Sequence, residues 1–302
     1  MNFSEIQINA ASESAAMGIQ KHIPKIDSFA KSFSGRTGTP YNGVALPIFS
    51  NVSGVNKYEN LLTTGNSSLY SDKYCPGEAL QGTVINLDKL YTKSYALTDY
   101  EVGSSDNLYL ADGARAMAEQ ISLEIANTIF TTTLSTTDIL AANNYSLSAD
   151  SKSKKAAFAG LFGAAANAGA NPYDCVVAVD APTFSTLLET LGDSCIYGGP
   201  EAVRNGVVPG LYGFRNVVVA PALPSGVKGF IIPWESIGIV NRYNKPAVDG
   251  YEATFASTDP HTGFTIGYRV YEDRCKGLAI MAADCLWGVK LIQPSKIVRI
   301  VA

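Results

Sequence analysis

Residues 211–226 read LYGFRNVVVAPALPSG. The valine run follows a glycine turn and predicts a strand, which Pro221 ends because proline has no N–H for a strand ladder. Pro224 and Gly226 predict a turn into the next apolar run, GFIIP. We expect Gly213 to take a turn conformation that is closed to β-branched residues. Since the stretch carries no catalytic group, it predicts a segment that shapes a fold.

The segments around this stretch alternate strands with helices. CVVAVD (175–180) predicts a buried strand, and the helix after it places Pro182 in its first turn, where a missing N–H costs nothing. The Ala-rich run 154–170 predicts a helix that ends at Gly169. RNVVVAPALP and KGFIIPWESIGIVNRY predict two further strands, and the chain from Gly250 onward predicts short strands separated by glycine turns.

The clearest helix is expected at residues 106–136. Its apolar residues recur at steps of three and four, which places them on one face of a helix. Arg115, Glu119 and Glu124 lie elsewhere around the axis. The expected apolar face consists of Leu110, Ala114, Met117, Ala118, Ile121, Ile125 and Ile129. A helix of this length is typical of a structural spine.

The first hundred residues contain fewer core signals. Residues 1–50 are rich in Ser, Gly and Ala, and their broken apolar pattern predicts an extended arm without a core element. Residues 51–105 place β-branched and aromatic residues between Gly82 and Gly103. This composition favours strands and predicts a long exposed β-hairpin.

The composition is that of a folded protein, because apolar residues make up 46% of the 302 residues and charged residues 17%. The net charge of −4 excludes the basic field that drives tight nucleic-acid binding. No run approaches the roughly 18–20 apolar residues of a membrane span, and the first residues do not resemble a signal peptide. We therefore expect a soluble protein that is made in the cytoplasm.

The cysteines and histidines do not form a metal or redox motif. The five cysteines are widely spaced without a Cys-x-x-Cys pair, and we expect buried free thiols. They are Cys75, Cys175, Cys195, Cys275 and Cys285. The two histidines are His22 and His261, and DPHTG around His261 and Asp259 is more typical of a polar turn than of a ligand pair.

Other candidate catalytic groups are weak. Ser151 and Lys154 match S-x-x-K, but the S-D-N and K-T-G partners of that motif are absent. No nucleophile elbow and no glycine-rich phosphate loop occurs. The carboxylate pairs Glu119 with Glu124 and Glu272 with Asp273 indicate solvated surface. We therefore predict no catalytic, cofactor-binding or metal-binding residue, no cofactor, and a structural protein rather than an enzyme.

Four motifs carry a resemblance to a known family. They are GTVINLDKLYTKSYALTDYE at 82–101, NPYDCVVAVDAPTFSTLL at 171–188, the glycine-to-proline unit at Gly210–Pro224, and GFIIPWESIGIV at 229–240. In this order, over roughly residues 55–300, they resemble the major capsid proteins of tailed bacteriophages. The resemblance implies the Hong Kong 97-type (HK97-like) capsid fold of class α+β, with an N-terminal arm, an extended β-hairpin loop, a spine helix, a peripheral domain and an axial domain.

The resemblance also implies a division of the chain. The implied parts are an N-terminal arm at 1–50, an extended loop (E-loop) at 51–105, a peripheral domain at 106–170 with its spine helix at 106–136, an axial domain at 171–260, and return strands of the peripheral domain at 261–302. Some relatives cross-link Lys to Asn between subunits. Lys73 and Asn66 lie in the loop, but no spacing singles out a pair, so the sequence does not predict whether a cross-link forms.

The function that the resemblance implies is a phage major capsid (head) protein. It would self-assemble into an icosahedral shell of pentamers and hexamers that encloses double-stranded DNA, with its location in the virion. Its partners would be further copies of itself, with scaffolding, portal and decoration proteins as candidates, non-specific contact with packaged DNA, and no membrane. Two alternatives stay open: an encapsulin-like compartment shell, and an α/β enzyme with a site built from scattered residues such as Asp180, Glu189 and Arg204.

Overall fold

The structure is a computed structural model of the whole chain, and its described residues fall into several ranges. They are 5–22, 26–34, 43–48, 81–98, 108–147, 154–191, 207–209, 213–234, 236–244, 251, 253–260, 262–273 and 275–301. The chain divides into two compact units, residues 45–84 and the remainder. At the smaller unit, β2 (Gly43–Ile48) and β3 (Gln81–Asn86) pair as a two-stranded sheet.

Six of the described strands form the first sheet of the larger unit. Its order is β1 (Ala30–Ser32), β10 (Ile237–Arg242), β13 (Leu278–Leu291), β12 (Thr265–Asp273) and β11 (Ala253–Thr258), and β4 (Lys89–Thr98) also pairs with β13. The long strand β13 pairs with β12 along its first half and with β10 along its second half. Because β4 pairs with β13 from Leu278 to Trp287, β13 is the central strand of this sheet.

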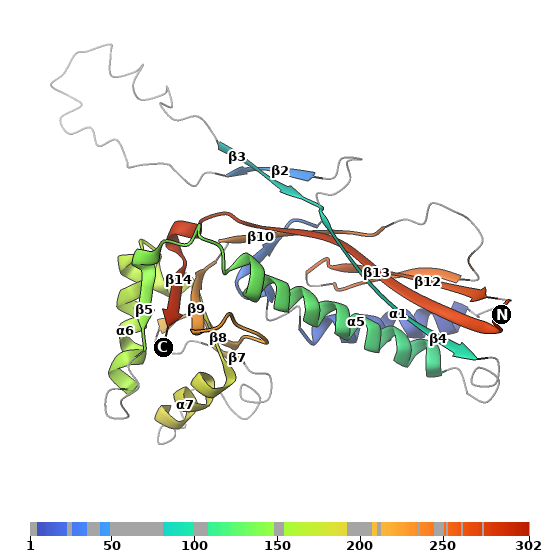
Figure 1. Cartoon of the computed structure of the whole chain (residues 1–302), viewed down its shortest axis with the longest axis horizontal. Helices are drawn as coiled ribbons and strands as arrows, with labels where there is room; N and C mark the ends of the chain where they lie inside the picture. Colours follow the sequence, from blue (N-terminus) through green and yellow to red (C-terminus); the bar gives the residue numbers. More distant parts are fainter. Residues whose placement is uncertain are drawn as a thin grey trace, which may run out of the picture. The chain divides into compact units, whose positions relative to one another are not determined.

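The expected spine helix is present and packs on this sheet. Helix α5 (Leu108–Thr128) continues as one π-helical turn, η2 (Ile129–Thr133), and runs beside β13 and β4 in Figure 1. The seven residues of the expected apolar face are all 7% exposed or less, which confirms the face. The Tyr268 hydroxyl of β12 donates to the Ala114 carbonyl oxygen at 3.1 Å, so helix and sheet also share a hydrogen bond.

The prediction that residues 1–50 contain no core element is wrong. Helix α1 (Glu5–Gln20) packs against α5, and its residues Ala11, Ala15 and Ile19 are fully buried. Strand β1 then pairs in parallel with β10. The apolar pattern looked broken because the buried face of α1 consists mostly of alanine and glycine, which bury little area individually but allow two helix backbones to approach closely.

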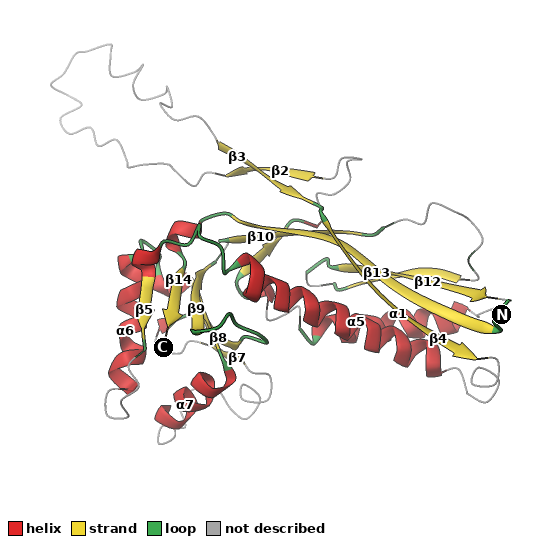
Figure 2. Cartoon of the chain, viewed as in Figure 1, coloured by secondary structure: helices red, strands yellow, loops and turns green. Residues whose placement is uncertain are grey.

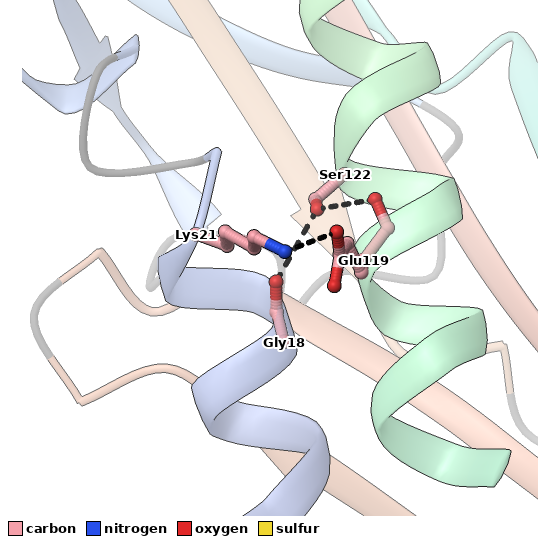
Figure 3. Close-up of polar contacts among 4 residues, drawn as sticks. All are labelled: Gly18, Lys21, Glu119 and Ser122. Atoms are coloured by element: carbon pink, nitrogen blue, oxygen red, sulfur yellow. Dashed lines mark hydrogen bonds and ion pairs between the residues drawn. The ribbon is translucent and has the colours of Figure 1, made fainter. Parts of the chain in front are cut away.

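The crossing of α1 and α5 depends on Gly18. A Cβ at Gly18 would lie 2.5 Å from the Arg115 carbonyl oxygen, so only glycine fits there without a shift. Figure 3 shows the polar contacts beside this crossing. The Ser122 hydroxyl donates to the carbonyl oxygens of Gly18 and Glu119, and the Lys21 ammonium group forms an ion pair with the Glu119 carboxylate.

The second sheet of the larger unit has two helices on one face and the hydrophobic core around α1 and α5 on the other. Its order is β5 (Asn144–Ser146), β14 (Val298–Val301), β9 (Val227–Pro233), β6 (Cys175–Val179), β8 (Asn216–Val219) and β7 (Val207–Pro209). One face packs against α6 (Lys154–Asn167) and α7 (Ala181–Leu191), which Figure 2 shows in red beside these strands. The other face joins the core that contains α1 and α5.

The opening stretch of the sequence forms the expected strand and turn. Strand β8 ends before Pro221, the Val227 N–H donates to the Pro224 carbonyl oxygen at 3.1 Å, and Gly226 has a φ of +79°. The run GFIIPWESIGIV is not one strand. It supplies β9 to the second sheet and β10 to the first, because the chain turns at Pro233, whose carbonyl oxygen accepts from the Ser236 hydroxyl at 2.6 Å.

The strands expected near residues 84–97 are confirmed as β3 and β4, but their pairing differs from a hairpin within 51–105. Strand β3 pairs with β2, which precedes residue 51, and β4 pairs with β13 nearly two hundred residues later. Strand pairing over such a separation leaves no local sequence signal. The remainder of the expected loop, 51–80 and 99–105, lies outside the described residues.

The expected domain limits do not coincide with the two sheets. Strands β10 and β11 lie within 171–260 but belong to the first sheet, whereas β14 lies within 261–302 and belongs to the second. Strand β5 and helix α6 also belong with the second sheet although they precede residue 171. The chain therefore passes from one sheet to the other more often than the expected domain limits imply.

Candidate functional site

The second sheet carries an exposed aromatic side chain. Tyr173 is 66% exposed, although it lies two residues before the fully buried strand β6. Its ring contacts Phe162 of α6 edge to face, with 5.3 Å between the ring centroids and 76° between the planes. Phe162 also contacts the buried ring of Phe214, with 6.1 Å between centroids. The Tyr173 ring is therefore supported by its neighbours and open to solvent, which is typical of an interface anchor.

Gly213 contacts this aromatic pair and has a φ of +83°, as its turn predicted. A Cβ at this position would lie 3.1 Å from Phe162 Cε2 and 3.5 Å from Tyr173 Cε1. We expect Gly213→Val to lower the free energy of unfolding by about 2 kcal/mol, because valine must adopt a left-handed backbone and displace Phe162. Urea unfolding of the full chain measures the change.

Gly213→Ala is the matched control for that variant, since alanine shares the backbone penalty but lacks the branched side chain. We expect its loss to be the smaller of the two. A valine variant with normal stability and a normal yield of assembled protein would contradict the turn argument.

A groove separates α6 from β5, which lie side by side in Figure 1. Its volume is about 440 Å³. The α6 wall consists of glycine and alanine with one asparagine, and the opposite wall includes two asparagines and a tyrosine. The lining residues are Gly160, Gly163, Ala164, Asn167 and Ala168 on one side and Ala142, Asn143, Asn144, Tyr145 and Val298 on the other. Leu140, 51% exposed, precedes this second wall in the chain.

The chain is anchored to the first sheet just before β4. Ile85 and Leu87 are buried, at 0% and 5% exposure. Two glycines of the first sheet make room for the segment 85–87 to pass over it. A Cβ at Gly238 would meet Ile85 Cδ1 at 2.6 Å, and a Cβ at Gly288 would overlap the Asn86 carbonyl oxygen. Beyond the crossing, Leu90 is 52% exposed, while the Tyr91 hydroxyl bonds Thr128 at 2.6 Å. The segment 85–87 is therefore packed tightly against the first sheet.

One ion pair lies within the first sheet. Arg269 of β12 contacts Asp284 of β13 at 2.5 Å, and Asn244 donates to the same carboxylate at 3.2 Å. Burial raises the pKa of the Asp284 carboxyl group, an effect that the guanidinium of Arg269 opposes. The pair links neighbouring strands, and its low exposure indicates a structural part.

Of the two candidate catalytic carboxylates, the structure describes that of Asp180, which makes structural contacts. Asp180 Oδ1 accepts from the Thr183 N–H at 2.9 Å and caps α7, while Oδ2 pairs with Lys228 at 3.5 Å. The side chain of Glu189 and all of Arg204 lie outside the described residues. The structure thus places Asp180 as a helix cap.

Asp259 is buried in the turn that the sequence predicted. Its carboxylate accepts from the Thr262 N–H and hydroxyl at 2.9 and 2.5 Å, and from Gln20 of α1 at 3.1 Å. His261 lies outside the described residues. The sequence predicted the turn but not the hydrogen bond that Gln20 of α1 donates to the Asp259 carboxylate.

The remaining candidates are surface or buried groups without shared geometry. Glu119 pairs with Lys21, and a hydrogen bond from that lysine lowers the pKa of the Glu119 carboxyl group. Ser151 and the side chain of Lys154 lie outside the described residues, as do Lys73, Asn66, Cys75 and Cys195. Burial raises the pKa of the Cys175 thiol to about 12, and burial also raises the pKa of the Cys285 thiol. Cys275 is exposed, contrary to the expected burial.

Within the described ranges, no group of three His, Cys, Asp or Glu side chains is placed to hold a metal ion. Among the helices that the structure describes, none is long and apolar enough to cross a membrane. The outstanding features of the surface are thus the supported Tyr173 ring, the α6 groove and the anchored segment before β4.

No protein-family model matches the chain, and no curated protein matches its sequence. Solved structures do match. The capsid of a native gene-transfer-agent particle is 12% identical with a TM-score of 0.56, covering 93% of this chain and 89% of that one. The capsid of cyanophage P-SCSP1u is 16% identical with a TM-score of 0.53, covering 90% and 86%. A virus-like particle from Pyrococcus furiosus is 12% identical with a TM-score of 0.55, covering 95% and 96%.

These likenesses extend over nearly the whole of each chain. The expected α+β class and the resemblance to phage capsid proteins are therefore confirmed at the level of the fold.

Proposed function

We propose that this chain, which has the Hong Kong 97-type capsid fold, is a phage major capsid protein that self-assembles into an icosahedral shell of pentamers and hexamers around double-stranded DNA. The observation that supports this most is the whole-chain likeness to capsid shells. The surface features agree with it, since they suit contact with other molecules. The carboxylates of Asp180 and Asp259 are engaged in a helix cap and a turn.

In this proposal the two sheets correspond to the two capsid domains. The second sheet with α6 and α7 would be the axial domain, which meets its copies around the five-fold and six-fold axes. The first sheet with the spine helix α5 would be the peripheral domain. The segment that Ile85 and Leu87 anchor would lead into the extended loop, so that a pull on the loop is transmitted to β13.

The charge of the chain suits an inner wall that faces packed DNA. A strongly basic wall would bind phosphates and hold the DNA in place. A net charge of −4 keeps such contacts weak and non-specific. The protein would be made in the host cytoplasm and reside in the virion.

A compartment shell that encloses proteins is the second candidate. It is favoured by the likeness to the virus-like particle from Pyrococcus furiosus, which extends over almost the whole of both chains. The two candidates share a fold and differ in their contents. Nuclease-resistant DNA in particles from the native source supports the phage capsid, and a protein cargo without DNA supports the compartment.

Electron microscopy of the purified full chain tests the proposal. We expect closed shells, or rings of five and six copies, over a range of salt and protein concentrations. An enzyme of this size would instead remain a monomer or small oligomer. A constant small mass under all conditions, with and without co-expressed neighbouring phage proteins, would overturn the proposal.

A further inference from the structure

The α6 groove contains a glycine, Gly163, that is not explained by packing against the described residues. A Cβ at Gly160 would collide with the Tyr145 hydroxyl, so the packing of Tyr145 explains that glycine. A Cβ at Gly163 would have no atom within 4 Å, although Gly163 lies inside the helix α6. Glycine is the least favourable helix-interior residue after proline. Gly163 is exposed, and the open space over it would let a side chain from outside the subunit approach the helix backbone.

Tyr173 has the opposite character, because most of its side chain is exposed at the surface of the subunit. The ring is 66% exposed, and its edge-to-face contact with Phe162 restricts its motion. Phe162 belongs to the same helix, α6, that forms the wall of the groove. One helix thus supports a projecting aromatic ring and lines an empty groove.

We propose that Tyr173 of one copy inserts into the groove between α6 and β5 of the next copy, over Gly163. This inference rests on the proposed shell function and specifies one of its contacts. A projection on one surface and a recess on another form a heterologous contact. Repetition of such a contact gives a ring when the rotation between copies closes, as five-fold and six-fold rotations do. The same contact can serve rings of five and of six, because one ring in a wide groove tolerates a small change of angle.

The chemistry of the groove suits a tyrosine. Its volume of about 440 Å³ accommodates an aromatic side chain, and its small apolar wall allows the flat face of the ring to approach the helix backbone. The Asn144 and Asn167 amides lie in the lining, and an amide can accept from or donate to a phenol hydroxyl. A partly restricted tyrosine loses little conformational entropy on binding, which is why such residues serve as anchors.

Disulfide trapping tests the contact. Tyr173→Cys and Gly163→Cys are made in separate chains, in a background where Cys75, Cys195 and Cys275 are replaced by serine and the buried Cys175 and Cys285 are kept. The two variants are mixed, assembled and oxidised mildly. We expect a cross-linked dimer that contains one chain of each variant, and a ladder of multimers when both cysteines are in the same chain.

Ala166→Cys is the matched control, because Ala166 is exposed on α6 but does not line the groove. We expect it to give no dimer with Tyr173→Cys. In an independent measurement, Tyr173→Ala should raise the concentration at which half of the chain assembles by about tenfold or more, the usual scale for loss of an aromatic anchor. Gly163→Arg, whose Cβ has open space around it, should do the same without loss of folding.

The outcomes distinguish a failure of this contact from a failure of the proposed shell function. Particles that form normally from all variants, with no Tyr173-to-Gly163 cross-link, overturn the contact and leave the shell function intact. Cross-linking of Tyr173 to Ala166 as efficiently as to Gly163 also overturns the contact. A chain that folds but never assembles, even unmodified, contradicts the proposed function itself.

Discussion

Replacing Trp287 with alanine is expected to lower the free energy of unfolding by about 3–5 kcal/mol. Trp287 is fully buried in β13, where it pairs with Lys89 of β4 on one side and Asn241 of β10 on the other. Its ring contacts Tyr91 edge to face, with 5.4 Å between centroids. Three strands meet at this side chain, so its removal leaves a cavity that no single strand can close.

Trp287→Phe is the informative companion variant. Within the described part of the chain, the Trp287 Nε1 donor is buried without a hydrogen-bond partner. Phenylalanine removes that donor and keeps most of the ring, so we expect a loss of about 1 kcal/mol. Urea unfolding of the full chain, followed by circular dichroism, gives both values. An alanine variant that loses less than the phenylalanine variant would contradict the packing argument.

The second large effect concerns Gly288, one residue further along β13. A Cβ there would overlap the Asn86 carbonyl oxygen, which belongs to the backbone and cannot rotate away. We expect Gly288→Ala to lower the free energy of unfolding by about 3 kcal/mol, because the crossing segment must lift off the sheet. The same substitution should expose the segment before β4 to limited proteolysis, since Ile85 and Leu87 lose their burial.

Gly163→Ala is the matched control, and its expected effect has the opposite sign. Nothing lies within 4 Å of its Cβ, and alanine in a helix interior is favoured over glycine by about 1 kcal/mol. We therefore expect the unassembled chain to become more stable. If both alanine variants change stability in the same direction and by the same amount, the local geometry at Gly288 is not the cause.

Local patterns predicted the elements whose neighbours lie close in sequence. The apolar face of α5 was readable because large side chains recur at helical spacing, and each of them is buried. Strand β6, the proline in the first turn of α7 and the turn at Pro224 to Gly226 followed from residue types alone. The candidate site was predicted only as an absence of chemistry, and neither Tyr173 nor the α6 groove was foreseen.

Helix α1 illustrates the limit of such patterns. Its buried residues Ala11, Ala15 and Ile19 give little hydrophobic signal, and its close packing on α5 requires a glycine at position 18. That fit involves a helix about a hundred residues away. A sequence pattern records which residues avoid water, but not which distant backbone comes within reach.

By itself, the sequence determined the spine helix, the strand and turn at residues 211–226, and the order of motifs that resembles capsid proteins. These depend on side-chain size, periodicity and backbone restrictions within a few residues. Only the tertiary structure decided that β4 pairs with β13, that one apolar run serves two sheets, and that α6 carries an aromatic ring and a groove. Those features depend on which distant surfaces meet, because contact free energy is set by complementary shape in space and not by separation along the chain.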